Sequence, residues 1–191
     1  MGLVPRTKEF DETEVLELFR ARGFKQTSFD DLTQELGVSR QSLYDTYGDK
    51  NTLFHAALRR YLAGGLEKMS RTLDNPAPIR EVMAGLFEGL ISANCGKSCS
   101  GCLMVNTMVE LSPHDPEIKQ MAAEDARAIE GLLAGRFAAA QRQGEIAANK
   151  DPAALAHFFY HFILGLGVAS RAFGDPESLR RSVQVALESL S

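Results

Sequence analysis

Three cysteines lie within eight residues, at Cys95, Cys99 and Cys102, and they are the most reactive side chains in the sequence. A structural zinc site needs four ligands, and nothing in the sequence places His114 as the fourth. A thiolate of lowered pKa senses oxidants or electrophiles, and Lys97 and a helix start at Cys102 would both favour the anion. A redox pair of Cys99 and Cys102, as in a thiol oxidoreductase, is an enzymatic alternative. The plainest interpretation is that Cys102 is a small buried residue and that the other two are loop thiols.

A histidine pair, His157 and His161, is the second group that could do chemistry. Residues four apart share one face of a helix, and this spacing can bind a metal ion. The intervening residues are Phe158, Phe159 and Tyr160, and no glutamate stands where a metalloprotease helix has one. We therefore interpret both histidines as core or interface residues, and the sequence predicts no metal site, no cofactor and no catalytic residue.

Polar residues surround a tight turn within positions 27–50, where two short helices are predicted. Gly37 permits a positive φ, Val38 fills the angle between the helices, and Ser39 caps the second one. This pattern is typical of a helix-turn-helix, whose second helix presents its first residues to base edges in the major groove of DNA. Arg40 and Gln41 stand there.

The region from Phe10 to Tyr61 resembles the DNA-binding part of the TetR family of bacterial transcriptional regulators. The residues that carry the resemblance, all in register, are Leu18-Phe19-Arg20-Ala21-Arg22-Gly23-Phe24, Thr27-Ser28, Gly37-Val38-Ser39, Leu43-Tyr44, Tyr47, Lys50 and Leu53. The resemblance implies an all-α fold, with an N-terminal three-helix helix-turn-helix domain and a C-terminal helical bundle that binds an effector and dimerises. Some repressors of this family also resemble the chain in a Gly-Cys-Leu stretch and sense electrophiles through cysteine.

The candidate DNA contacts follow from residue chemistry and from the resemblance together. Arg40 can donate two hydrogen bonds to guanine, and Gln41 suits adenine. The resemblance implies that Tyr44 contacts the DNA backbone or a base. It also implies that Thr27, Ser28, Tyr47 and Lys50 contact DNA phosphates. Alternatively, the side chains of Arg40 and Gln41 are simply solvated, and Tyr47 belongs to the core instead of contacting DNA. The predicted set is Thr27, Ser28, Arg40, Gln41, Ser42, Tyr44, Tyr47 and Lys50.

The composition limits the functions that these residues can serve. Of the 191 residues 45% are hydrophobic and 24% charged, and the net charge is −4, which excludes wholesale disorder and a broadly basic nucleic-acid coat. Positions 1–60 hold nine Lys or Arg and ten Asp or Glu, so a DNA surface there requires the acids of the first helix to face away.

Positions 152–170 lack charge, but their polar residues favour a buried helix over a membrane span. Three closely spaced cysteines suggest a reducing compartment and a cytoplasmic protein.

The elements that must position these residues are all predicted to be helices. The break at 73–78 separates a helix-turn-helix domain at 1–50, with a connecting helix at 51–73, from a ligand-binding and dimerisation domain at 74–191. The first predicted helix ends at Gly23, the second spans 30–36, the third lies between Ser39 and Gly48, and the fourth runs from Asp49 to about 73. The remaining predicted helices span 79–93, 103–111, 116 to about 143, 152–173 and 176–190.

The C-terminal region contains the predicted dimer contact and the predicted pocket. Small residues at Gly165 and Ala169, on a stripe with Phe158 and Phe162, let two helices approach closely and suit a dimer-forming bundle. The candidate effector-pocket residues are Met83, Phe87, Leu90, Met104, Met108, Phe158 and Phe162.

Together these features predict a homodimeric regulator that is not an enzyme. It would bind double-stranded DNA at a palindromic operator as a repressor, and a small hydrophobic or electrophilic effector would release it. The thiol oxidoreductase, and a helical interaction protein that no longer binds DNA, are the rival functions.

Overall fold

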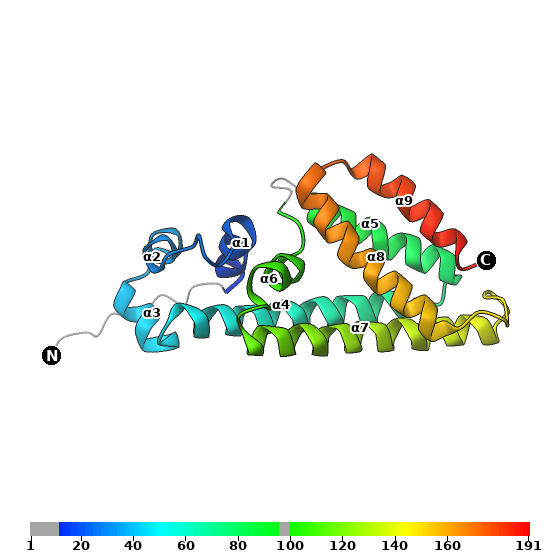
Figure 1. Cartoon of the computed structure of the whole chain (residues 1–191), viewed down its shortest axis with the longest axis horizontal. Coiled ribbons are helices and arrows are strands. Elements are labelled where there is room, and N and C mark those ends of the chain that lie inside the picture. The colour runs from blue at the N-terminus through cyan, green and yellow to red at the C-terminus, as the bar shows by residue number, and fades with distance from the viewer. Residues whose placement is uncertain (1–11, 96–99) are drawn as a thin grey trace. The chain divides into compact units, whose positions relative to one another are not determined.

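A computed structural model describes residues 12–95 and 100–191, and within these residues it contains helices and no strand (Figure 1). The predicted all-α fold is therefore confirmed. The helices in chain order are α1 (Glu12–Arg22), α2 (Phe29–Leu36), α3 (Arg40–Tyr47), α4 (Lys50–Leu73), α5 (Ile79–Asn94), α6 (Leu103–Leu111), α7 (Pro116–Arg142), α8 (Pro152–Phe173) and α9 (Pro176–Glu188).

The first compact unit contains α1, α2, α3 and the part of α4 up to Tyr61. Each helix turns an apolar face inward, because its hydrophobic residues recur at helical spacing. The rings of Phe19 in α1 and Phe54 in α4 meet edge to face, with their centroids 4.8 Å apart. The fully buried side chains of this unit include Val15, Phe19, Leu32, Leu43, Leu53, Phe54 and Leu58.

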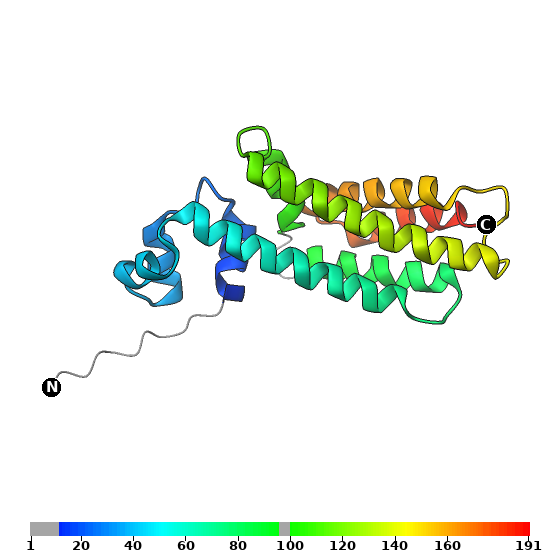
Figure 2. The same ribbon diagram turned by 90° about the horizontal axis from the view of Figure 1, so that it is seen from below.

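The second compact unit runs from Leu62 to Ser191, so the division falls inside α4. Within this unit α7 packs along α8, and α5 packs against α8 and α9 (Figure 2). Phe159 of α8 lies at the centre, with ring centroids 5.4 Å from Phe137 of α7 and 5.8 Å from Phe87 of α5. Aromatic packing therefore joins these three helices into one core.

Three helices of this unit begin in the same way. Asp115, Asp151 and Asp175 each precede a proline, and each accepts one or two hydrogen bonds of 2.9 to 3.2 Å from backbone N–H groups of the first turn. These aspartates satisfy backbone groups that a helix start otherwise leaves unbonded, and proline suits the first helical position. The predicted starts of α8 and α9 are confirmed.

By length and composition alone, helix α8 is long and apolar enough to cross a membrane. Of its most apolar stretch of 18 residues, 33% is buried inside the protein. The expectation of a buried helix holds for one face only, which carries Ala156, Phe159 and Leu166. The opposite face exposes Phe158 and Val168, which are 45% and 51% accessible.

Candidate functional site

The turn between α2 and α3 has the geometry of a helix-turn-helix. Gly37 ends α2 in the left-handed region, with φ of +63°. Ser39 then caps α3, because its hydroxyl oxygen accepts a hydrogen bond of 3.1 Å from the backbone N–H of Ser42. Leu43 is fully buried, so the opposite, polar side of α3 faces outward.

Arg40 lies in the first turn of α3 in a cluster of polar and aromatic groups. Its Nη1 donates a hydrogen bond of 2.8 Å to Oδ1 of Asp30, and its guanidinium lies 5.9 Å from the ring centroid of Phe29 and 5.7 Å from that of Tyr44. The Phe29 and Tyr44 rings stack at 4.7 Å. The hydrogen bond with Tyr44 and the charge of Asp30 raise the pKa of Arg40 above its ordinary value. The side chain is thus held at the exposed start of α3 while still 56% accessible.

Gln41 is the second exposed residue of this turn. Its Nε2 donates a hydrogen bond of 2.7 Å to Oδ1 of Asp45, one helical turn later. Asp30 and Asp45 were not among the predicted site residues, yet DNA would have to compete with them for Arg40 and Gln41. The four-residue spacing could have revealed Asp45, whereas Asp30 comes from another helix and left no local signal.

Thr27 and Lys50 have mainly internal contacts. Thr27 is fully buried, and its Oγ1 donates a hydrogen bond of 2.7 Å to the carbonyl oxygen of Gly23. The Nζ of Lys50 donates hydrogen bonds of 3.0 Å to the carbonyl oxygens of Phe24 and Thr27, and it lies 4.1 Å from the centroid of the Phe24 ring. Lys50 therefore ties the start of α4 to the segment that precedes α2.

Ser28 caps α2 and exchanges hydrogen bonds with Asp31. The backbone N–H and the hydroxyl of Ser28 donate to Oδ2 of Asp31 at 2.7 and 2.6 Å, and they lower the pKa of that carboxyl. Tyr47 is half-buried near the end of α3. The structure thus brings all eight predicted residues into one unit, five of them on α3, and their contact with DNA stays a prediction.

The cysteine region borders α5 and α6. Cys99 lies outside the described residues, whereas Cys95 follows α5 and Cys102 directly precedes α6, and both are half-buried. The carbonyl oxygen of Ser100 accepts hydrogen bonds of 3.0 Å from Nδ2 of Asn106 and from Nη1 of Arg171. This segment is therefore fastened to α6 on one side and to α8 on the other.

A buried tyrosine and a half-buried carboxyl lie in the same part of the bundle. Burial raises the pKa of Tyr160 on α8 to about 12, and the charges of Asp125, Glu130 and Cys102 contribute. Burial also raises the pKa of Asp125 on α7 to about 6. Neither residue is among the predicted site residues, and an acid on a charged helix such as α7 usually belongs to a solvated face.

The candidate effector-pocket residues differ in their burial. Met83 and Phe87 are fully buried and Met104 nearly so, whereas Phe158 is exposed. The ring of Phe87 packs against Phe162 at a centroid distance of 5.4 Å, as in a filled core. Their role in effector binding stays a prediction.

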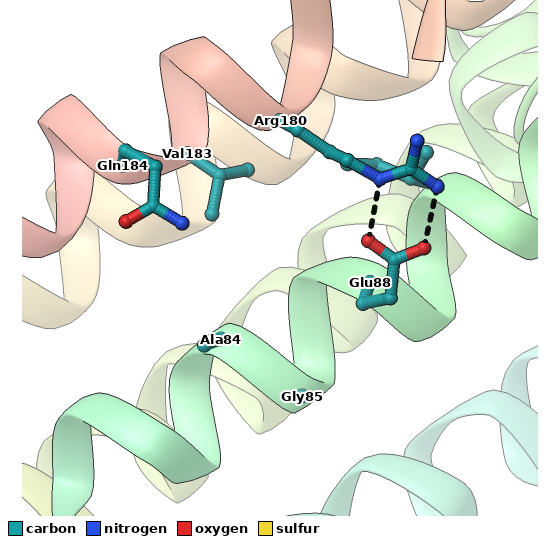
Figure 3. A pocket seen from close by; sticks show the side chains of 7 residues that line it. Ala84, Gly85, Glu88, Arg180, Val183 and Gln184 are labelled. Atoms are coloured by element: carbon teal, nitrogen blue, oxygen red, sulfur yellow. Dashed lines mark hydrogen bonds and ion pairs between the residues drawn. The ribbon is translucent and has the colours of Figure 1, made fainter. Parts of the chain in front are cut away.

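A surface pocket lies elsewhere, between α5 and α9 (Figure 3). Arg180 of α9 spans it, donating hydrogen bonds of 2.8 and 2.7 Å to the two carboxylate oxygens of Glu88 on α5. The lining residues are Ala84, Gly85, Glu88, Ile91, Arg180, Val183 and Gln184, and none of them was predicted as a pocket residue.

Two family models match separate regions of the chain. Residues 15–57 match the family model described as bacterial regulatory proteins, tetR family. Residues 93–186 match the model described as tetracyclin repressor-like, C-terminal domain.

Individual relatives agree with these models along nearly the whole chain. The HTH-type transcriptional regulator YezE of Bacillus subtilis is 33% identical over 97% of this chain and 98% of its own length. The HTH-type transcriptional repressor ComR of Escherichia coli is 30% identical over 95% of this chain and 88% of its own length. Among solved structures, a cysteine mutant of the regulator CifR, complexed with 26-bp operator DNA, is 26% identical with a TM-score of 0.84, covering 97% of this chain and all of that one. With the helix-turn-helix geometry of α2 and α3, these matches establish that the chain belongs to the TetR family of transcriptional regulators.

Proposed function

We propose that this regulator is a repressor that binds a palindromic operator as a homodimer and leaves it when an effector binds the second unit. The observation that carries the proposal is the exposed, polar first turn of α3, with Arg40 and Gln41 held at the surface of a compact helix-turn-helix unit. The repressor ComR and the operator complex of CifR support it by similarity.

A binding assay on the DNA upstream of the chain's own gene tests this function. We expect protein titrated into labelled promoter DNA to retard a discrete fragment, and footprinting to reveal an inverted repeat protected on both halves. Unlabelled promoter should compete far better than random DNA of equal length. Equal competition by random DNA would favour the rival, a helical interaction protein.

The dimer contact is proposed on α8 and α9. The exposed face of α8 carries Phe158 and Val168, and α9 exposes Val185, which is 68% accessible. A Cβ added at Gly165 would meet no atom within 4 Å, so this position on α8 is open to a second helix. A stripe of this kind suits a two-fold contact between identical helices, and two-fold symmetry of the protein matches a palindromic operator.

The proposed effector is a small hydrophobic or electrophilic compound. Cys102 sits at the start of α6, directly before its first turn. An adduct there would disturb a segment fastened to both α6 and α8, and an allosteric shift then weakens DNA binding.

Two measurements on Cys102 decide its role. We expect rapid alkylation of Cys102 near neutral pH, and a loss of promoter affinity after mild peroxide or electrophile that Cys102→Ser prevents. Slow alkylation with unchanged affinity would leave a hydrophobic effector as the alternative.

We further propose that the protein acts in the cytoplasm and is not an enzyme. A thiol oxidoreductase that uses Cys99 and Cys102 would leave the helix-turn-helix unit without a role. A catalytic peroxide-reduction assay separates the two functions, because turnover that Cys99→Ser abolishes would establish the enzyme.

A further inference from the structure

Two neighbouring helices of the second unit bring together three side chains that can ligate a metal. Glu130 comes from α7, and His157 and His161 come from α8. Each residue offers one candidate ligand atom, and these three atoms lie within 4.8 Å of one another. The sequence shows the histidine pair but no carboxylate beside it, and the packing of α7 along α8 supplies that carboxylate.

The hydrogen bonds of His161 leave one ring nitrogen available to an ion. Its Nδ1 lies 2.8 Å from the backbone carbonyl oxygen of His157. A carbonyl oxygen can only accept, so Nδ1 carries the proton and Nε2 of the neutral ring carries a lone pair. Metal-ligating histidines usually have their other ring nitrogen fixed in this way. The two imidazole rings meet edge to face with centroids 4.3 Å apart.

Glu130 and His157 form the other half of the cluster. Oε1 of Glu130 lies 2.7 Å from Nδ1 of His157, and the histidine side chain is 67% accessible. Among the described residues Glu130 has no lysine or arginine partner, in contrast to Glu88, whose two oxygens are both bound by Arg180. The contact of Glu130 with His157 is therefore the one that the metal site would use.

We propose that Glu130, His157 and His161 bind one divalent transition-metal ion of the Zn²⁺ class. Two imidazole nitrogens and one carboxylate oxygen suit zinc and its neighbours, whereas Mg²⁺ and Ca²⁺ prefer oxygen ligands alone. Ligand bonds of about 2.0–2.2 Å place tetrahedral ligand atoms roughly 3.3–3.6 Å apart. Oε1 and Nδ1 need only part slightly from their hydrogen bond, while the proton moves to Nε2 of the same His157 ring, and water completes the coordination.

This site goes beyond the proposed function and does not rest on it. All three residues belong to one chain and one compact unit, so the ion needs neither DNA nor a second copy. Its direct effect is to cross-link α7 to α8 at the place where Glu130 and His157 already share a hydrogen bond.

The test uses the full-length, tag-free protein after treatment with a chelator. Zn²⁺ is titrated in competition with a chromophoric chelator, and we expect one equivalent bound per chain. His157→Gln and His161→Gln should each weaken binding by more than about 100-fold, and Glu130→Gln by about 10- to 100-fold. His114→Gln is the matched control, because it removes an exposed histidine outside the cluster and should leave the affinity unchanged.

Co²⁺ provides an independent readout that separates this site from the cysteines. We expect visible d–d bands without the near-ultraviolet charge transfer of a thiolate ligand, both in the parent and in a chain with Cys95, Cys99 and Cys102 replaced by Ser. Circular dichroism establishes that each variant is folded. Parental affinity in the three cluster variants would overturn the proposal, and so would a thiolate band that disappears with the cysteines. A stoichiometry of half an equivalent per chain would also contradict it. If the protein does not compete with the chelator at all, Glu130 and His157 are an ordinary surface pair.

Discussion

Arg40 and Lys50 are both cations of the predicted DNA surface, yet their surroundings give them different roles. Arg40 contacts the carboxylate of Asp30 and remains more than half accessible. The amine of Lys50 instead donates to two backbone carbonyl oxygens and lies over the ring of Phe24. Replacing each residue therefore tests a different property of the protein.

Arg40→Ala should weaken binding to the operator by about 10- to 100-fold and relax the preference at one base position. The physical reason is that a guanidinium makes two hydrogen bonds to guanine that no alanine replaces. Fluorescence anisotropy with the operator and with single-base variants measures both effects. Unchanged discrimination among these DNAs would exclude base reading by Arg40.

Lys50→Met should lower the free energy of unfolding of the first unit by about 1–3 kcal/mol, because two charged hydrogen bonds and a cation–π contact are lost. Urea denaturation, followed by circular dichroism, measures this loss. If Lys50 also neutralises a phosphate, the slope of log affinity against log salt should fall by about one. A variant with parental stability would show that the contacts to Phe24 and Thr27 contribute little.

The segment that leads into α6 depends on two glycines. Gly101 has φ of +69°, and a Cβ there would lie 2.9 Å from Cβ of Arg171. A Cβ added at Gly167 of α8 would lie 3.1 Å from Cβ of Cys102. The backbone before α6 thus approaches α8 so closely that side chains at these positions would collide, and this approach fixes where Cys102 lies.

Gly101→Ala should lower the free energy of unfolding by about 1–3 kcal/mol, because it combines a left-handed backbone with a steric clash. Gly131→Ala is the matched control: this glycine lies inside α7, and an added Cβ meets nothing within 4 Å. The control should raise stability by about 0.5–1 kcal/mol, since alanine is the better helix former. Two variants of equal stability in urea would contradict this description of the segment.

Asp125 makes the stability of the second unit depend on pH. Burial raises the pKa of its carboxyl from 3.8 to about 6, so the folded state favours the protonated form. Its contribution is fully present below about pH 4 and is lost as the pH rises through 6. Asp125→Asn should therefore stabilise the protein at pH 7.5 by about 1 kcal/mol, a value reduced because the carboxyl keeps part of its solvent. Urea unfolding of both chains at pH 4.5 and 7.5 should show a gain that is larger at the higher pH, and an equal gain at both values would refute the raised pKa.

Among the described residues, the second unit exposes large apolar side chains on both α8 and α9. Phe158 and Val168 on α8 and Val185 on α9 are exposed, although their helices bury other residues tightly. Exposed apolar side chains gathered on neighbouring helices commonly mark an interface. A homodimer typical of the family would cover them and set the spacing of its two recognition helices.

Gly165→Trp should convert the dimer to monomer and reduce operator affinity, because an indole would fill the space that a second helix needs. Gly135→Trp on α7 is the control, since an added Cβ also meets nothing there within 4 Å. Sedimentation velocity measures the oligomeric state, and anisotropy measures DNA binding. A variant that stays dimeric would move the proposed contact away from Gly165.

The sequence by itself determined the helices, most of their ends and the helix-turn-helix. Gly37, Ser39 and the aspartates before Pro116, Pro152 and Pro176 act within one turn of the backbone, so their effects can be read from neighbouring letters. The TetR resemblance then identified the family, because it depends on many such residues in register.

Only the tertiary structure decided which distant residues meet. Lys50 reaches carbonyl oxygens 23 and 26 positions earlier, and Glu130 reaches His157 across 27 positions. Asp125 and Tyr160 acquire raised pKa values because the packing of their helices removes water from around them. Such pairings depend on how helices pack, and hydrophobic periodicity specifies which face of a helix is buried but not which helix covers it.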